Sequence, residues 1–296
     1  YVCNIYNVDV NDLNLLKKTI IKEVDKFLNS YKSQGHNSKS LDNYNRFIYL
    51  IPIDCDGWGG LGDVGKYEGI SISVINLPGI RADAFAHEFG HNLGLYHANF
   101  LYCGEESIKS SLKECESIEY EDNFDVMGIF SSRLPHFNAI HKEMLSWIDP
   151  AQIQEVRDSG VYEIYAIENP IFDVKNVIKM PRINKNRLER SDWYYLEYRA
   201  PVGFDEEGIK LNGKLNQGIF LHLSWKKNGG DTQLIDVHRD INDYVVIALG
   251  ETYFDPVGGF TIKNLRGDLE RAEIEIDFNP HGIFMRGDAN RDEKLD

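Results

Sequence analysis

Residues 87–97 of the chain read His87-Glu88-Phe89-Gly90-His91-Asn92-Leu93-Gly94-Leu95-Tyr96-His97. This is the HExxHxxGxxH pattern, with two histidines four residues apart and a glutamate after the first. Side chains four apart lie on one face of a helix, so His87 and His91 can offer ring nitrogens to a single metal ion. Glycine tolerates the left-handed conformation that ends helices, so Gly94 lets the chain turn and bring His97 back as a third ligand.

This donor set predicts a catalytic zinc site, because three protein ligands leave one position of a tetrahedral Zn²⁺ ion open. Glu88 lies about a quarter-turn of helix from the histidines, where it can reach a water on the metal without being a ligand. We expect Glu88 to act as general base and then general acid in peptide hydrolysis. Apolar residues at three- and four-residue steps predict the core-facing side of the helix, namely Ala82, Phe85, Ala86, Phe89 and Leu93.

A methionine-containing stretch, Phe124-Asp125-Val126-Met127-Gly128, follows the third histidine. Together with the extended zinc pattern it resembles the methionine turn of the metzincin zinc endopeptidases. By that resemblance Met127 lies beneath the metal as a hydrophobic floor, although a lone methionine is more often plain core. Ile129 stands where astacin-like and serralysin-like members carry a ligand tyrosine, so this chain departs from those two subfamilies.

Three other stretches of the chain resemble the gametolysin-type peptidases and their bacterial relatives. These stretches are residues 54–62, 137–147 and 192–199. The resemblance implies a secreted zinc endopeptidase that acts on protein or glycoprotein substrates of the extracellular matrix or the cell surface. It also implies that residues 130–132 line the pocket for the residue after the cleaved bond. By the same likeness, residues 69–75 form an edge strand to which a substrate chain adds.

The rival interpretation is a catalytically idle metzincin scaffold that serves as an adhesin and binds through its second domain. An idle site has no chemical reason to keep both Glu88 and all three histidines, so the enzyme is favoured. Two further histidines, His136 and His141, lie on the next expected helical segment. Because the zinc ligands are already accounted for, we interpret these two as structural.

The pattern along the chain predicts an α+β metzincin-type catalytic domain over residues 1–150, with a twisted mixed sheet and the zinc helix. Residues 1–10 and 46–53 are predicted strands, 11–31 a helix, and the glycine-rich segment through Gly65 a loop. After residue 151, short strands between turns predict a β-sandwich over 151–280. These strands are 161–167, 174–180, 193–198, 218–225, 232–236, 244–249, 260–262 and 272–278.

The remaining residues, 281–296, are interpreted as a linker and a truncated calcium loop. Oxygen ligands alternate there as D-x-N-x-D with a further aspartate, namely Asp288, Asn290, Asp292 and Asp296. This resembles the opening of a dockerin module, which implies Ca²⁺ and a cohesin partner for a longer parent chain. Glu293 occupies the usual glycine position, so a disordered acidic tail is the alternative.

Four cysteines, Cys3, Cys55, Cys103 and Cys115, allow three disulfide connectivities. Cys103 and Cys115 bracket a short polar loop and are the favoured pair, which leaves Cys3 for Cys55. An even count of cysteines in an enzyme expected to be secreted suggests disulfides. The chain opens at Tyr1 in a strand-like run with no signal-peptide pattern, so we interpret it as a mature or trimmed chain.

The formal net charge of −15 disfavours nucleic acid as a partner, because phosphates would be repelled. The same charge suits calcium or cationic substrates, or simply forms a solvated acidic surface. No apolar run reaches the roughly 18 residues that predict a membrane span.

Overall fold

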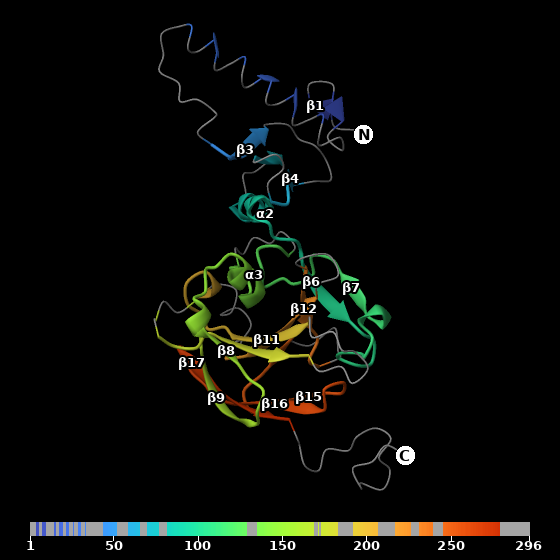
Figure 1. Cartoon of the computed structure of the whole chain (residues 1–296), viewed down its shortest axis with the longest axis vertical. Coiled ribbons are helices and arrows are strands. Elements are labelled where there is room, and N and C mark those ends of the chain that lie inside the picture. The colour runs from blue at the N-terminus through green and yellow to red at the C-terminus, as the bar shows by residue number, and fades with distance from the viewer. Residues whose placement is uncertain are drawn as a thin grey trace. The chain divides into compact units, whose positions relative to one another are not determined.

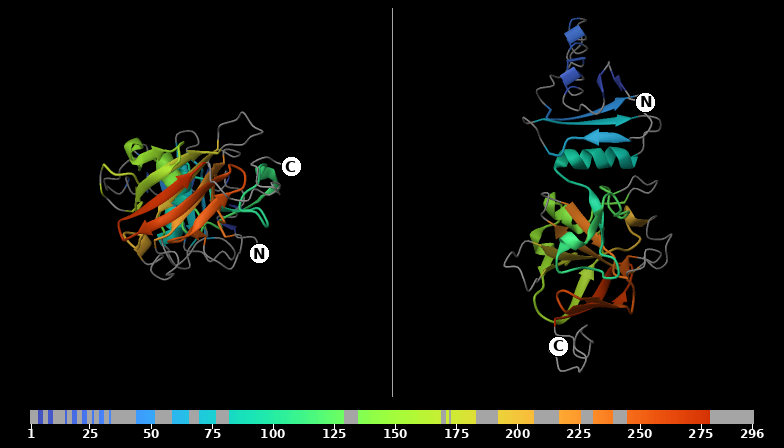
Figure 2. Two further views of the ribbon diagram at one scale, coloured as in Figure 1. Left: turned by 90° about the horizontal axis from the view of Figure 1, so that it is seen from below. Right: turned by 90° about the vertical axis from the view of Figure 1, so that its right-hand side faces the viewer.

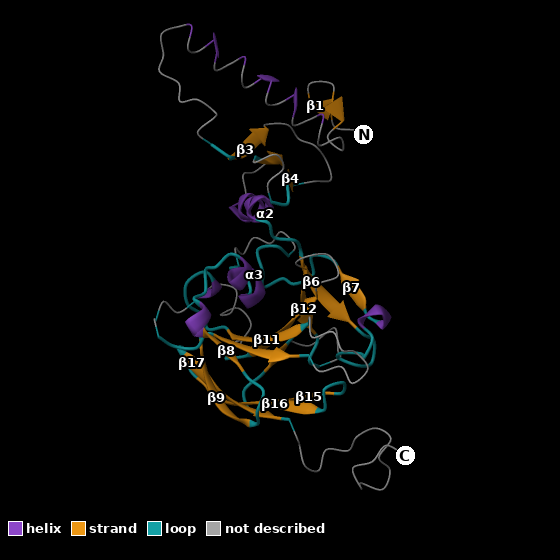
Figure 3. Ribbon diagram, in the orientation of Figure 1, coloured by secondary structure: helices purple, strands orange, loops and turns teal. Residues whose placement is uncertain are grey.

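The structure of the chain is a computed structural model, shown in Figure 1. It describes residues 4–5, 8–9, 15, 18–19, 22–23, 26, 29–30, 33, 44–51, 59–65, 70–76, 82–128, 135–168, 171, 173–182, 192–206, 217–225, 231–238 and 245–278. Among them, strands greatly outnumber helices (Figure 3), and helices are not interleaved regularly with strands. The predicted α+β class is therefore confirmed at this coarse level.

The chain divides into two compact units, an N-terminal unit (Tyr1–Gly94) and a C-terminal unit (Leu95–Asp296). The domain boundary predicted near residue 150 falls inside the C-terminal unit. The assignment of separate domains to 1–150 and 151–280 stays a prediction.

A three-stranded sheet forms the described centre of the N-terminal unit, in the order β3 (Arg46–Ile51), β5 (Ser71–Asn76), β4 (Gly60–Gly62). Strand β3 runs parallel to β5, and β4 runs antiparallel to it. Strand β5 is thus central in the described sheet, and residues 71–75 are all buried. The prediction of an edge strand at 69–75 is wrong, because the glycine-rich segment predicted as loop contains β4, which pairs alongside β5.

Helix α2 (Ala82–Leu93) packs along this sheet, against β5 and β4 (Figure 2). The side-chain amide of Asn92 donates to the carbonyl oxygens of Asp63 (3.1 Å) and Ile72 (3.3 Å), and the Ser73 hydroxyl donates to the Glu88 carbonyl (2.9 Å). These bonds hold a polar face of the helix against the sheet. The expected core-facing stripe is consequently the less buried face, with Phe85 41% exposed.

The remaining described parts of the N-terminal unit are short. Strands β1 (Asn4–Ile5) and β2 (Val8–Asp9) pair antiparallel, so the single strand predicted over 1–10 is a pair of two-residue strands. The described positions between 15 and 33 are helical, in agreement with the helix predicted over 11–31.

The larger sheet of the C-terminal unit has the strand order β7-β6-β13-β12-β11-β10-β8, and β14 also pairs with β12. Its strands are β6 (Ala98–Tyr102), β7 (Glu116–Ile118), β8 (Ile153–Glu155), β10 (Val177–Pro181), β11 (Trp193–Tyr198), β12 (Ile219–Trp225), β13 (Asp231–Ile235) and β14 (Val246–Ile247). Two pairings are parallel, β6 with β13 and β8 with β10, and the others are antiparallel. The strand that follows the histidine segment is therefore joined to a strand from late in the chain.

A four-stranded antiparallel sheet has the order β15-β16-β17-β9. Its strands are β9 (Gly160–Tyr165), β15 (Thr252–Asp255), β16 (Phe260–Gly267) and β17 (Arg271–Asp277). In β17 the apolar residues Ala272, Ile274 and Ile276 are buried and alternate with charged residues, which is the pattern of a strand with one covered face. One apolar core takes side chains from both sheets, including Leu196, Leu221, Ile262 and Ile274.

Helix α3 (Ala139–Met144) packs against β11, and the same unit contains two 3₁₀ turns, η2 (Leu112–Glu114) and η3 (Pro150–Gln152). Asn138 caps α3, because its side-chain oxygen accepts the backbone N–H of His141 at 3.0 Å. A second apolar cluster beneath this helix includes Ile140, Val177 and Tyr195.

Each strand predicted between 161 and 278 has a counterpart, with ends displaced by a few residues. Strands β6, β7, β8 and β15 are not predicted by the sequence pattern. In the part of the chain that the structure describes, no helix has the length and apolarity needed to cross a lipid bilayer.

Candidate metal centre

Two of the predicted ligands, His87 and His91, lie one turn apart on helix α2. Both are buried, with 2% and 7% of their surface exposed. Their rings meet edge to face, with centroids 4.8 Å apart and an interplanar angle of 85°. The four-residue spacing thus places both imidazoles on one face of the helix, as predicted.

The third predicted ligand follows the glycine that ends the helix. Gly94 has φ of +103°, and its N–H donates to the His91 carbonyl at 2.8 Å, so the helix stops and the chain turns. The ligand atoms of His87, His91 and His97 all lie within 4.8 Å of one another. Among the described residues, no other trio of histidine, cysteine or acidic side chains converges in this way. This group can hold a metal ion, and the identity of that ion stays a prediction.

Glu88 follows His87 in helix α2 and lies against strand β4, with only 3% of its surface exposed. Two glycines make this close approach possible. A Cβ at Gly60 would lie 2.6 Å from Glu88 Cγ, and a Cβ at Gly62 would lie 2.8 Å from the Glu88 carbonyl oxygen. Any other residue at Gly60 or Gly62 would therefore collide with the glutamate or its backbone.

Burial raises the pKa of Glu88 to about 8. A carboxylate without a nearby positive charge is penalised when it leaves water. A divalent cation next to Glu88 would favour its ionised form and so oppose this effect of burial.

Met127 is fully buried, and its carbonyl oxygen accepts the N–H of Ala98, the residue after His97, at 2.9 Å. The Asp125 carboxylate shapes the turn that carries Met127. It accepts the N–H groups of Met127 and Asn138, both at 2.6 Å, and it lies 2.9 Å from Nδ1 of His141. Burial alone would raise the pKa of Asp125, but His141 and these N–H donors together lower it. The role of Met127 as floor of a metal site stays a prediction.

A buried ionic network surrounds this turn inside the C-terminal unit. Asp122 lies 3.0 Å from Nε2 of His222. Arg199, fully buried, donates to Glu197 at 2.7 Å and to Asp205 at 3.0 Å. The structural interpretation of His141 agrees with this environment, because its Nδ1 pairs with Asp125 and its ring has no exposed surface.

The turn after strand β7 carries two residues that contact His97. Glu119 Oε1 lies 2.6 Å from His97 Nδ1. The Tyr120 ring lies against the imidazole, with a centroid distance of 3.9 Å. Tyr120 has φ of +69°, and its N–H donates to the Asn99 side chain at 3.1 Å. Sequence reasoning missed Glu119, since nothing in the local pattern links it to a histidine 22 residues earlier in the chain.

The favoured disulfide, Cys103–Cys115, is confirmed. Several other predicted features lie outside the described residues, so the structure says nothing of them. They are the pair Cys3 and Cys55, the position Ile129, the pocket-lining residues 130–132, and the candidate calcium ligands Asp288, Asn290, Asp292 and Asp296.

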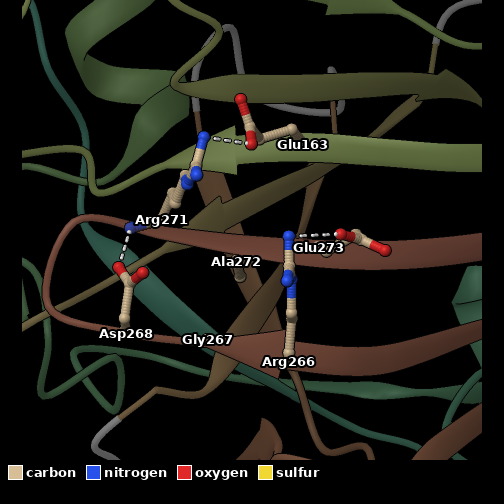
Figure 4. Close-up of a pocket in the computed structure, with 7 residues that line it drawn as sticks. All are labelled: Glu163, Arg266, Gly267, Asp268, Arg271, Ala272 and Glu273. Atoms are coloured by element: carbon tan, nitrogen blue, oxygen red, sulfur yellow. Dashed lines mark hydrogen bonds and ion pairs between the residues drawn. The ribbon is translucent and has the colours of Figure 1, made fainter.

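A surface pocket of about 110 Å³ lies on the four-stranded sheet, away from the histidine segment in sequence (Figure 4). Its arginines are already paired, Arg271 with Glu163 (2.6 Å) and Arg266 with Glu273 (3.0 Å). Because each guanidinium has a neighbouring carboxylate, this pocket offers no unpaired arginine for a ligand. The histidine segment remains the stronger candidate site.

No protein-family profile, curated protein or solved structure matches this chain. The assignment of function therefore depends on the chemistry of the site itself.

Proposed function

We propose that this protein is a secreted zinc-dependent endopeptidase of metzincin, gametolysin-like type. The observation that carries the proposal is the convergence of three histidine ligand atoms within 4.8 Å, together with a buried glutamate, Glu88, that directly follows His87 in the helix. The proposal includes a metzincin-type arrangement around the zinc helix and a β-sandwich formed by the later strands. The Cys103–Cys115 disulfide supports an oxidising compartment outside the cytoplasm.

The donor set fits Zn²⁺. Neutral imidazoles are preferred zinc ligands, and three of them with no thiolate match catalytic rather than structural sites. Zn–N distances of about 2.0–2.1 Å separate two nitrogens of a tetrahedral site by about 3.3 Å. The histidine ligand atoms lie within 4.8 Å of one another, so small side-chain rotations would bring them to the spacing that zinc requires. Carboxylate-rich Ca²⁺ or Mg²⁺ coordination does not match this trio.

Bound Zn²⁺ would supply Lewis acidity, polarising a peptide carbonyl and lowering the pKa of a coordinated water to about 7. Glu88 does the proton transfer in this proposal. Its carboxylate takes a proton from the attacking water and passes it to the leaving amine, so it ends the cycle ionised again. The dry surroundings of Glu88 suit this role, because burial makes a carboxylate a better proton acceptor.

Strand β4 is the better candidate for binding the substrate backbone. It is the described edge of the sheet beside α2, and it runs next to Glu88. An extended peptide can add to such an edge through main-chain hydrogen bonds, which tolerate many side chains. This replaces β5, which is central and has no free edge in the described sheet.

The test uses the full chain with casein and gelatin as substrates. We expect cleavage that a chelator abolishes and added Zn²⁺ restores. Glu88→Ala should bind Zn²⁺ with wild-type stoichiometry and lose activity by several orders of magnitude. His87→Ala should lose both zinc and activity.

Near-normal turnover by Glu88→Ala would refute the mechanism. A wild-type chain that binds Zn²⁺ but cleaves neither casein, gelatin nor a proteome-derived peptide library would instead support the idle binding scaffold.

A further inference from the structure

His97 differs from the other two candidate ligands in how its ring is held. His87 and His91 are carried by one helix, whereas His97 immediately precedes strand β6. Two residues of another strand's turn contact its imidazole, Glu119 through Nδ1 and Tyr120 through its ring face. These contacts occur within the C-terminal unit and fix the side that faces away from any metal bound through Nε2.

The register of β6 and β7 explains why Glu119 reaches this histidine. Phe100 pairs with Ile118 in the antiparallel ladder. Continuing that register by one residue sets Glu119 opposite Asn99, which is two residues from His97 and therefore on the same face of the strand pair. The Asn99 side chain then accepts the Tyr120 N–H and helps hold the turn.

The backbone conformation of Tyr120 is unusual for a bulky residue, and it is a second indication that this turn has a functional role. Its φ of +69° lies in the left-handed region, which bulky side chains rarely adopt. This conformation accompanies the ring contact between Tyr120 and His97, at 3.9 Å between centroids. Unfavourable backbone geometry of this kind persists where surrounding contacts enforce it, often at functional sites.

We propose that Glu119 is a positioning residue that holds His97 as an Nε2 ligand, with Tyr120 packed against the ring. This inference rests on the proposed zinc function and assigns that site a carboxylate–histidine pair. A carboxylate that accepts Nδ1–H fixes the tautomer, leaves the Nε2 lone pair free and raises its basicity toward a metal. At 2.6 Å, the contact has the length of a short charge-assisted hydrogen bond.

Glu119 is well suited to mutation, because its side chain is 63% exposed and its removal leaves no buried hole. The metal-free protein gives the first readout. Long-range ¹H–¹⁵N spectra, with His97 assigned by comparison with His97→Asn, should show the Nδ1–H tautomer in the wild type. In Glu119→Ala the same resonances should move toward a mixture of tautomers.

Zinc affinity gives the second readout, measured by competition with a chromophoric chelator. Glu119→Ala should weaken Zn²⁺ binding by about 10–100-fold. Glu119→Gln keeps an acceptor oxygen without the charge and should recover part of this loss. Glu121→Ala is the matched control, since it removes another exposed carboxylate two residues away, and it should change zinc affinity by less than about twofold.

The possible outcomes distinguish a failure of the Glu119 role from a failure of the proposed zinc function. Wild-type affinity in Glu119→Ala, or an equal loss in Glu121→Ala, would overturn the role of Glu119 while leaving a zinc site in place. A wild type with the Nδ1–H tautomer but no Zn²⁺ binding would overturn the proposed function, and the role in metal binding with it. An Nε2–H tautomer in the wild type would overturn the positioning role directly.

Discussion

Replacing Gly60 by alanine tests whether Glu88 acts from the place that the structure gives it. The new Cβ would lie 2.6 Å from Glu88 Cγ, 2.7 Å from Oε1 and 2.9 Å from Cδ. Carbon atoms in contact normally lie about 3.5–4.0 Å apart, so one partner must move by about 1 Å. Strand β4 is held by its pairing with β5, and the glutamate side chain is therefore the part that moves.

A displacement of about 1 Å at a catalytic group costs about 100-fold in rate, which corresponds to about 2.7 kcal/mol of activation free energy. The assay is kcat/KM on a quenched fluorescent peptide chosen from the mapped cleavage sites. Zinc affinity should stay unchanged, because the three atoms closest to the new methyl group all belong to Glu88.

Gly160→Ala is the matched control. It adds the same methyl group to a strand of the four-stranded sheet, where the nearest atom is the Tyr162 hydroxyl at 3.3 Å. Wild-type kcat/KM in Gly60→Ala would refute the reasoning, since either β4 does not lie against Glu88 or Glu88 is not the proton acceptor. Joint loss of zinc and activity would also contradict it, because the displacement would then extend beyond the glutamate.

Two further predictions concern the buried network of the C-terminal unit. Arg199→Met should lower the free energy of unfolding, measured in urea, by about 3–5 kcal/mol. The substitution leaves the carboxylates of Glu197 and Asp205 buried without the guanidinium that pairs with both. A loss below about 1 kcal/mol would contradict this prediction. Burial alone would lower the pKa of His222, but Glu197 and Asp122 raise it overall. The stability that protonated His222 contributes should therefore be complete below about pH 6.5 and be lost as the pH rises through the higher folded-state pKa. Urea unfolding from pH 6 upward should show this slope in the wild type and a flatter one in His222→Asn, and equal slopes would exclude His222 as its source.

The parts of the candidate site that could be predicted from the sequence are those set by local geometry. Helical periodicity alone brings His87 and His91 together. A glycine after the last helical residue predicts the left-handed turn found at Gly94. Cys103 and Cys115 are close in the chain, and this favoured their pairing before the fold was known.

The packing face of helix α2 shows where hydrophobic periodicity fails to predict the buried side. The apolar stripe containing Phe85 predicts one buried side, yet hydrogen bonds from Asn92 and Ser73 hold another side against the sheet. The close approach of β4 to Glu88 depends on Gly60 and Gly62. The sequence pattern predicts a loop at these two positions. A hydrophobic pattern reports only where apolar side chains recur. It contains no information about individual hydrogen bonds or about close contacts that only glycine permits.

Contacts between distant strands could not be predicted, although one signal was present. Glu197 and His222 are each flanked by apolar residues within a strand, and both are fully buried. A charged or polar residue in such a strand needs a buried partner, so the pattern indicates that partners exist. The partner of Glu197 is local, because Arg199 lies two residues further along the chain. The partner of His222 cannot be named from the pattern, because Asp122 reaches it only through the fold.

The same register determines how far the candidate site extends along the chain. Ala98, directly after His97, pairs with Thr232 of β13, and Thr232 accepts a hydrogen bond from Asn138 at 2.9 Å. Residues 1–150 alone would leave β6 without this neighbour and Asp122 without His222. Unpaired strand edges and uncompensated buried carboxylates both oppose folding. The later strands therefore support His97, the third candidate ligand, through β6 within the C-terminal unit.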